Sequence, residues 1–370
     1  MRPDRALDRN QDRGGHPRAS KYDAGHLEQA AALLDRLSAR GRALLGTRTA
    51  IMGGAMTWVS ERNLVAAISN AGGFGVIATG SMSPDQLAAE IAATSALTNQ
   101  PFGVNIITLH PRLRDLCDVC IAAKVGHVVL AGNLPKSVDI VHLKDGGVQV
   151  LGFAPTLGIA QRLVRTGADA IVIEGAEAGG HIGPVSLNVL AQEILPNIRD
   201  VPVFVAGGLG RGEAIASYLE MGAAGCQLGT RFVCASESIA HPAFKQAFVR
   251  AAARDAVPSV QIDPRFPVIP VRALANEGTR RFMEFQRTVV DRFNAGQVDQ
   301  ASAQLEIEHF WAGALRRAVV DGDVENGSVM AGQSVGMVRV VQPAAEIIQD
   351  LTTQAIVALA ERLASRDAAV

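Results

Sequence analysis

The sequence predicts a (β/α)8 barrel, or TIM barrel, with a mostly helical insertion after the eighth strand. Eight short apolar runs alternate with longer segments of helical periodicity, which is the pattern of a closed parallel barrel. The runs are continuous in Val, Ile and Ala rather than alternating with polar residues, as is typical of parallel strands buried on both faces. This alternation stops after Thr230, and aromatic residues concentrate from Phe232 onward.

Each apolar run is short enough to be one barrel strand. The eight runs are Thr49–Met52, Phe74–Ala78, Phe102–Ile106, His127–Ala131, Val148–Phe153, Ala170–Glu174, Pro202–Ala206 and Gly225–Leu228. Helical patterns between them include Ser60–Asn70, Pro84–Leu97, Pro155–Thr166 and Arg211–Met221, whereas Lys136–Leu143 is a short, poor one. Eight β units with seven intervening helical segments favour a closed barrel over an open sheet.

The domain organisation follows from these patterns. Residues 1–25 are polar, and we expect a disordered tail there. An amphipathic stretch over His26–Leu45 opens the barrel, which comprises residues 26–235 and 337–370 and ends with a helix over Ala344–Ala364. We expect residues 236–336 to cover the mouth of the barrel above the substrate; a plain helical extension is the alternative.

Composition excludes several classes of function. Lys and Arg number 35 against 36 Asp and Glu, and no block of like charge suggests a nucleic-acid partner. No apolar run reaches the roughly 18 residues that span a bilayer, and from the polar N-terminal residues we expect no secretory signal. Four cysteines favour a reducing cytoplasm. Cys117 and Cys120 fall on a helical pattern, which favours packing over metal or redox chemistry, and we predict no metal site.

Glycines and polar residues follow the strands at the end where barrel enzymes carry their active sites. Gly207 and Gly208 come after the seventh run, and Gly229 and Thr230 after the eighth, where bare amides commonly bind phosphate. The stretch Gly208–Gly212 also resembles a dinucleotide loop, but it lacks a βαβ unit of its own and a suitably spaced acidic residue. A phosphate-bearing ligand held by both loops is the better interpretation.

His181 is the candidate catalytic side chain. It follows the sixth run inside a glycine-rich loop, Glu174–Gly183, where little local packing explains a histidine. The neighbouring glycines would let a planar ligand approach the backbone. A structural histidine is the alternative. The other seven histidines are interpreted as structural, with His110 and His241 the weaker cases.

Several segments together resemble the flavin family of nitronate monooxygenases and FMN-dependent enoyl-acyl-carrier-protein reductases II. The resemblance covers the chain from about Leu45 to its C-terminus. The matching segments are Met56–Val59, Asn70–Gly75, Phe102–Ile106, Glu174–Gly183, Ala206–Gly208, Gln227–Phe232, Glu237–Ser238, His241–Pro242 and Gly327–Gln333.

The resemblance implies a TIM-barrel oxidoreductase that binds FMN. The phosphate would lie on Gly207, Gly208, Gly229 and Thr230, and His181 would face the flavin and substrate as acid or base. The residues implied around the remainder of the flavin are Gly53, Gly54, Met56, Asn105, Glu174, Gly179, Gly180, Gln227 and Leu228. Those implied on the substrate side are Met330, Ala331, Gly332 and Gln333.

The resemblance leaves two chemistries open. We favour the enoyl reductase branch, in which NADH or NADPH reduces FMN and the hydride then passes to an enoyl thioester. The partners that this reading allows are acyl carrier protein and a second copy of the chain in a homodimer. The alternative is oxidation of alkyl nitronates with O2, and a lesser one is a phosphate-ligand barrel without redox activity. Gly53 stands where the family usually has Gln, and the usual proline before it is absent, so the substrate is the open question.

Overall fold

The computed structural model describes residues 24–367 and contains the predicted barrel. Its sheet has the order β1-β9-β8-β6-β5-β4-β3-β2, all neighbours parallel, and a bridge between Met52 and Phe74 closes the ring. All eight predicted strands are confirmed within a few residues at their ends. The strands are β1 (Ile51–Gly53), β2 (Gly75–Ala78), β3 (Phe102–Ile107), β4 (His127–Ala131), β5 (Gln149–Phe153), β6 (Ala170–Glu174), β8 (Val203–Ala206) and β9 (Gly225–Leu228).

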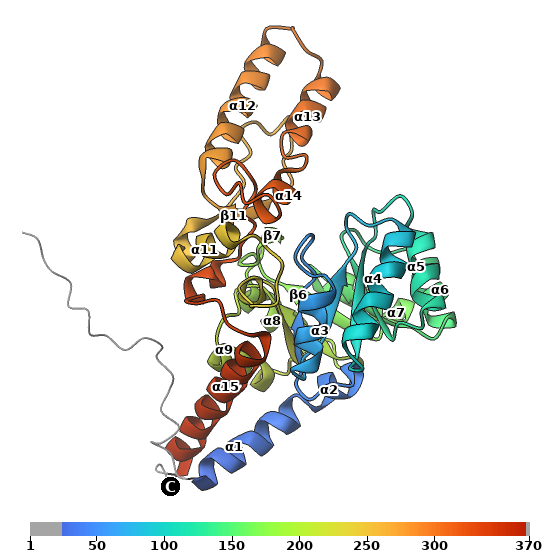
Figure 1. Ribbon diagram of the computed structural model, residues 1–370, viewed down its shortest axis with the longest axis vertical. Helices are drawn as coiled ribbons and strands as arrows, with labels where there is room; N and C mark the ends of the chain where they lie inside the picture. The colour runs from blue at the N-terminus through green and yellow to red at the C-terminus, as the bar shows by residue number, and fades with distance from the viewer. Residues whose placement is uncertain (1–23, 368–370) are drawn as a thin grey trace, which may run out of the picture.

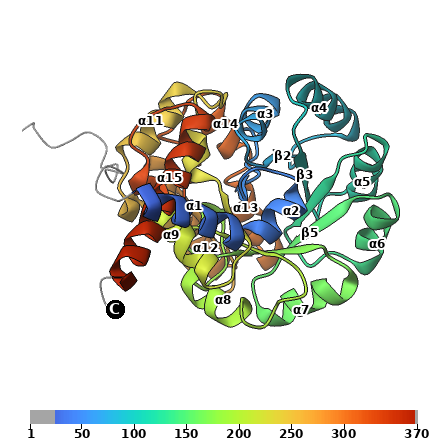
Figure 2. The ribbon, with the colours of Figure 1, turned by 90° about the horizontal axis from the view of Figure 1, so that it is seen from below.

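Helices surround the barrel, as the view along it shows (Figure 2). They are α3 (Arg62–Asn70), α4 (Pro84–Leu97), α5 (Leu113–Ala122), α6 (Ser137–Asp145), α7 (Leu157–Thr166), α8 (Leu187–Ile194), α9 (Gly212–Glu220) and α15 (Ala344–Asp367). Local sequence sets several of their ends. Ser83 and Gln86 form a capping box at the start of α4, and Thr156 caps α7. The poor pattern over Lys136–Leu143 does form a helix, α6.

The strands are apolar on both faces because they separate two cores. Side chains such as Met52, Val129 and Phe204 point into the barrel, while their neighbours in sequence pack outward against the helices. Leu45 joins the inner cluster from α2 (Ala39–Leu45), so this helix plugs the barrel end opposite the strand C-termini. The barrel is therefore a packed core and can open only at its mouth.

The chain enters and leaves the barrel through paired helices. The predicted amphipathic stretch His26–Leu45 is two helices, α1 (Ala24–Leu37) and α2, with Ser38 between them. The predicted disordered tail lies outside the described residues except for residues 24 and 25, which begin α1.

None of the described helices is long and apolar enough to cross a membrane. Cys117 and Cys120 are fully buried in α5, and their predicted packing role is confirmed.

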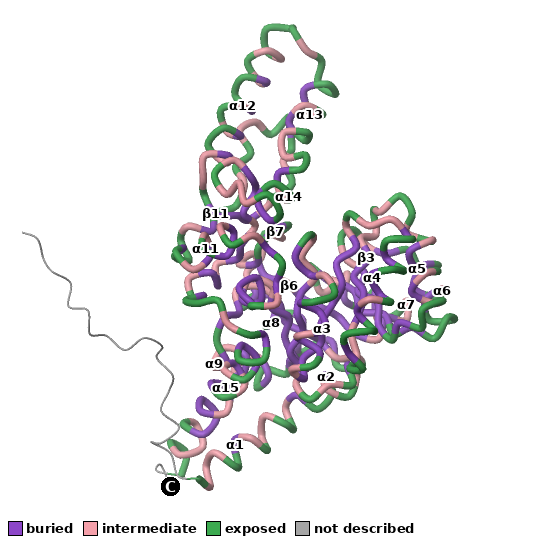
Figure 3. The backbone as a smooth tube through the Cα atoms, viewed as in Figure 1, coloured by how far each residue is buried: buried purple, intermediate pink, exposed green. Residues whose placement is uncertain are grey.

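The segment between β9 and α15 combines helices with short strands. It contains α10 (Thr230–Val233), α11 (Pro242–Arg250), β10 (Ala256–Pro258), β11 (Val271–Leu274), α12 (Glu277–Asn294), α13 (Gln300–His309) and α14 (Ala314–Val319). Figure 1 shows α12 and α13 projecting away from the barrel rather than lying over it. This hairpin is narrow, and purple buried stretches are few along it (Figure 3). Its own small core contains Phe282, Val289 and Ile307.

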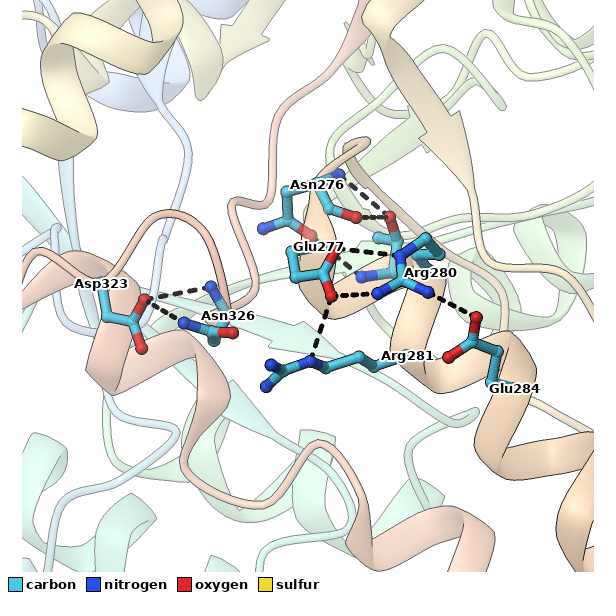
Figure 4. A network of polar contacts seen from close by, with 8 residues as sticks. Asn276, Glu277, Arg280, Arg281, Glu284, Asp323 and Asn326 are labelled. Carbon is cyan, nitrogen blue, oxygen red and sulfur yellow. Dashed lines mark hydrogen bonds and ion pairs between the residues drawn. The ribbon is translucent and has the colours of Figure 1, made fainter.

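Polar contacts fix the base of this hairpin (Figure 4). Asn276 caps α12 and donates from Nδ2 to the carbonyl oxygens of Val324 and Gly327, at 2.7 and 2.8 Å. Asp323 in turn accepts bonds from Asn326 at 3.0 Å, which shapes the turn that receives α12. Farther along the helix, Arg280 joins Glu277 to Glu284. The start of α12 is thereby tied to the segment that leads to residues 327–333.

Candidate active site

One layer of side chains forms the floor of a cavity at the barrel mouth. Side chains alternate along a strand, so the residue two positions after an inward residue also points inward. Near the C-terminal ends of β3, β6 and β9, the side chains of Asn105, Glu174 and Gln227 point inward, and on the neighbouring strands so do Ala78, Phe153 and Ala206. All six line one cavity of about 700 Å³. Three polar groups therefore meet on an otherwise apolar floor.

The carboxyl group of Glu174 is neutral at pH 7 in this setting. Burial raises its pKa to about 8, with no opposing charge or hydrogen bond among the described residues. Asn105 is held by a bond from its Nδ2 to the carbonyl oxygen of Val129 at 3.1 Å. Gln227 packs beside Gly54, where an added Cβ would lie 3.3 Å from its side-chain amide. The floor thus offers uncharged hydrogen-bonding groups to a planar polar ligand.

Bare backbone amides border the cavity between β8 and β9. Gly207 and Gly208 have φ of +88° and +70°, and a Cβ on Gly207 would lie 2.9 Å from the carbonyl oxygen of Gly175. Within residues 24–367, the N–H groups of Gly207, Gly208 and Gly229 donate to no backbone carbonyl. Beside them, Thr230 accepts a bond from the Gly332 amide at 3.0 Å through its Oγ1. Free donors in this arrangement suit a phosphate group.

His181 lies at the rim of the same cavity, in a short strand that the sequence did not predict. Strand β7 (Gly180–His181) pairs with β11, placing His181 opposite Val271 and Gly180 opposite Arg272. The His181 side chain is exposed toward the cavity, but the protein around it still removes water from much of its surroundings. This desolvation lowers the pKa of His181 below 6.5, so the imidazole is neutral at pH 7.

The loop that carries His181 is held from three directions. The buried Arg272 donates to the carbonyl oxygens of Ala176 and Ala256, at 2.9 and 2.6 Å. Glu177 accepts the Leu187 amide at 3.0 Å through its carboxylate. Gly179 lies so close to residues 331 and 332 that a Cβ there would approach the Gly332 nitrogen to 2.5 Å. The insertion therefore fixes the position of His181 as well as flanking it.

The structure brings most of the predicted site residues together. Those lining the cavity are Gly54, Met56, Asn105, Glu174, Gly179, Gly180, His181, Gly207, Gly208, Gln227, Leu228, Gly229, Thr230 and Met330. Gly53 is not among them, because it lies within β1 and faces Ile68. Ala331, Gly332 and Gln333 also do not line it. They pack against the loop that carries Gly179 and His181, on the side away from the cavity. The Gln333 amide donates to the Glu177 carbonyl oxygen at 2.9 Å.

Sequence analysis missed a second group of lining residues. Phe153 would have followed from strand parity, since it ends β5 two residues after the inward-facing Leu151. Ser334, Phe244, Ile269, Leu315 and Val319 come from the insertion and carry no local motif. Arg272 likewise gave no signal in the sequence. Residues 236–336 were predicted to cover the barrel mouth. Ile269 and Leu315 of this segment do line the cavity at the mouth, whereas α12 and α13 point away from it.

Comparison with known proteins identifies the family. The family model described as nitronate monooxygenase matches residues 39–122 and 116–354, which is most of the chain. The chain belongs to the nitronate monooxygenase family. It is therefore an oxidoreductase, and enzymes of this family are typically FMN-dependent.

Relatives within the family differ in the reactions for which they are named. A 5-hydroxy-7a-methyl-1-oxo-octahydro-1H-indene-4-carboxyl-CoA dehydrogenase of Mycobacterium tuberculosis is 31% identical, covering 85% of this chain and 94% of its own. A nitronate monooxygenase of Paraburkholderia phytofirmans is 28% identical, over 83% and 92% of the two chains. The structure of FabK from Thermotoga maritima matches with a TM-score of 0.78 and 35% identity. The match covers 90% of this chain and 99% of the FabK chain.

Proposed function

We propose that this protein is an FMN-dependent oxidoreductase that reduces an α,β-unsaturated acyl thioester with NADH or NADPH. The observation that carries the proposal is a single cavity with free amides at one end, a neutral imidazole at its rim and an apolar mouth. Leu109 and Ile269 line that mouth and are 67% and 66% exposed. Exposed aliphatic side chains suit an acyl chain better than a small, charged nitronate.

The residues of the cavity fit FMN. Gly207, Gly208 and Gly229 would bind its phosphate through their amides, and Asn105 and Gln227 would bond the polar edge of its ring. A cavity of about 700 Å³ lies within the range of roughly 300–1,000 Å³ that is usual for cofactor and ligand sites. When bound, FMN would supply the hydride chemistry that no side chain can perform.

The protein's own groups would orient and polarise the thioester. His181, neutral at pH 7, would donate an N–H to the thioester carbonyl oxygen, which draws electron density from the double bond and favours hydride arrival at the β-carbon. The α-carbon then takes a proton, and the rim of the cavity beside His181 is where that proton would be delivered. The apolar mouth would exclude water from the reacting atoms.

An anaerobic titration tests the reaction. Purified protein loaded with FMN is mixed with NADH or NADPH while the flavin absorbance is followed. We expect rapid bleaching that an enoyl thioester reverses. If neither nucleotide bleaches the flavin, the reductase proposal is wrong.

Cofactor placement is tested with Gly229→Val. The backbone at Gly229 has an ordinary φ of −103°, and a Cβ would meet only the Met56 side chain, 3.4 Å from its Sδ. The variant should therefore fold but fill the phosphate position, and we expect it to be purified without flavin. Gly158→Val is the control, since a Cβ there contacts nothing within 4 Å. A fully yellow Gly229→Val protein would exclude this phosphate site.

Nitronate oxidation is the second candidate. It is favoured by the Paraburkholderia relative and by the structure of a nitroalkane oxidase from Streptomyces ansochromogenes, which has a TM-score of 0.70 and 25% identity. Both are less identical to this chain than FabK or the CoA dehydrogenase. Anaerobic bleaching by an alkyl nitronate, with no bleaching by either nicotinamide nucleotide, would establish this activity instead.

A further inference from the structure

A tryptophan and an arginine contact each other beside residues that line the cavity, although neither lines it itself. Trp58 follows Met56 and Thr57, which line the cavity, and its side chain is 39% exposed. The guanidinium carbon of Arg316 lies 5.9 Å from the centroid of its ring. Arg316 follows Leu315, another lining residue, so the pair joins the β1 loop to α14 at the mouth.

The backbone of Trp58 is in an unfavourable conformation. Its φ is +68°, a left-handed value that is rare for a bulky residue and costs about 1–3 kcal/mol. The amides of Val59 and Ser60 both donate to the Met56 carbonyl oxygen, at 2.9 and 2.8 Å. Ser60 Oγ accepts the Met56 amide at 2.9 Å and donates to the Gly54 carbonyl oxygen at 3.0 Å. The loop is therefore tightly bonded in a form that presents the indole to solvent.

Packing does not explain this conformation. Large aromatic side chains stabilise a fold mainly by being buried. The Trp58 indole is 39% exposed, so it gains only part of this stabilisation. An aromatic surface held rigidly beside a ligand cavity is instead a typical platform for a planar ring. Stacking of a nucleobase on such a surface contributes about 1–3 kcal/mol.

The Arg316 guanidinium beside the Trp58 ring can bind an anion. Arg316 is paired with Asp321 at 3.1 Å, and both side chains are about half exposed. Exposed pairs of this kind are worth at most about 1 kcal/mol, so a phosphate can displace the carboxylate at little cost. A guanidinium binds phosphate oxygens in a bidentate geometry, which makes arginine well suited to the exchange.

We propose that Trp58 and Arg316 bind the adenosine diphosphate portion of a coenzyme, the adenine on the indole and the diphosphate on the guanidinium. Two coenzymes share this chemistry: the CoA of an acyl thioester and NAD(P)H. The choice of these two sources rests on the proposed function, whereas the adenine nucleotide site itself rests on the rim geometry. The reactive end of either coenzyme would extend from the rim into the cavity.

Steady-state kinetics with truncated substrates distinguish the sources. Wild type, Trp58→Ala and Arg316→Met are assayed with crotonyl-CoA and crotonyl-pantetheine, and with NADH and reduced nicotinamide mononucleotide. If CoA is the source, each substitution raises KM for crotonyl-CoA about tenfold, the effect of about 1.4 kcal/mol, and leaves KM for crotonyl-pantetheine unchanged. If NADH is the source, only its KM rises. Unchanged KM values for both full-length coenzymes would overturn the proposal.

A binding measurement keeps this test independent of turnover. FMN-loaded protein is titrated with ADP by calorimetry, and we expect Trp58→Ala and Arg316→Met to weaken binding about tenfold while Trp58→Phe retains most of it. The matched controls are Trp311→Phe, just after α13, and Arg287→Met, in α12, which should both bind as wild type does. ADP binding without thioester turnover would refute the proposed function but support this site. No difference between the Trp58 or Arg316 variants and wild type would refute the site.

Discussion

Two titratable side chains at the barrel mouth are both shifted toward their neutral forms. Burial raises the pKa of Glu174 to about 8 and lowers that of His181 below 6.5. The same physical cause acts in opposite directions because the carboxyl group is charged when deprotonated and the imidazole when protonated. At pH 7 the cavity therefore presents hydrogen-bonding groups without net charge from either residue, which suits an uncharged thioester.

His181→Asn should retain FMN but lower kcat at least about tenfold, the low end of what acid–base assistance contributes. For the wild type, we expect kcat/KM to fall as the pH is lowered through the pKa of His181, because protonation removes the neutral imidazole. Rate profiles from pH 5 to 8 check both points, with flavin absorbance as the measure of cofactor content. A variant with wild-type turnover, or one that keeps the acidic limb of the profile, would contradict this role.

Glu174→Gln should make the cofactor-free protein more stable at alkaline pH. The folded pKa is raised, so between pH 4.5 and about 8 the folded protein holds a proton that the unfolded chain releases. Stability is thus lost as the pH rises through this window. We expect the variant to melt about 2–5 °C above wild type at pH 9 and equally at pH 4.5. The exposed Glu193→Gln is the control, and equal melting points at pH 9 would contradict the neutral carboxyl.

At the scale of elements, the position of His181 depends on a contact between distant parts of the chain. Strand β7 leaves the barrel after β6, and its partner β11 belongs to the insertion, some 90 residues later. Arg272 adds side-chain bonds to the β7 loop and to β10. Strands β10, β11 and β7 form a sheet of three short strands, joined by a single bridge from Ala273 to Met330. So small a sheet is marginal alone and depends on such bonds.

Arg272→Met should reduce kcat at least about tenfold while FMN remains bound. The substitution removes two charge-assisted hydrogen bonds, each worth about 1.5–3 kcal/mol, and frees the loop that carries His181. We expect Arg272→Lys to restore part of the activity. Arg265→Met, at an exposed arginine of the same insertion, is the control. Unaltered kcat in Arg272→Met would show that β11 does not position the histidine.

At the scale of the whole molecule, the two ends of the described chain meet on the outside of the barrel. Helices α1 and α15 run side by side near α9 (Figures 1 and 2), and Ala30, Ala216 and Leu359 form a shared apolar cluster. This cluster is separate from the cavity at the opposite end of the barrel. Its contribution should therefore be to stability alone.

Leu359→Ala tests this separation. Removing a fully buried leucine side chain should lower the free energy of unfolding by about 2–5 kcal/mol. We expect a clear fall in melting temperature with unchanged flavin content and kcat at 25 °C. Val189→Ala, at an exposed position of α8, should alter the melting temperature far less. Loss of FMN or activity in Leu359→Ala at 25 °C would show that the helix pair and the active site are coupled.

Much of the site was predictable because it lies where local sequence fixes geometry. Buried parallel strands are continuous apolar runs, so β1 to β6, β8 and β9 could be located, and their C-terminal ends meet at one mouth. Glycines such as Gly207 and Gly208 marked the loops because only glycine readily takes those backbone angles. His181 was identified for the same reason, as an unpacked histidine in a glycine-rich loop.

Other features depend on contacts between residues distant in sequence. Gly53 was predicted to border the flavin, but strand parity turns it toward Ile68. The segment from Met330 to Gln333 was predicted to contact substrate, whereas three of its four residues support the Gly179 loop from behind. Neither Arg272 nor the Trp58–Arg316 pair forms a local motif, since each acts on a partner more than 90 residues away.

The sequence by itself therefore determined the barrel and the end of it where the candidate site lies, and it marked the glycines and the histidine that line the cavity there. Each of these depends on hydrophobic periodicity or on backbone angles, which are properties of short segments. The tertiary structure decided how the insertion holds His181, which residues form the apolar mouth, and where the α12–α13 hairpin points. These depend on packing between segments far apart in the chain, which no short stretch of sequence specifies.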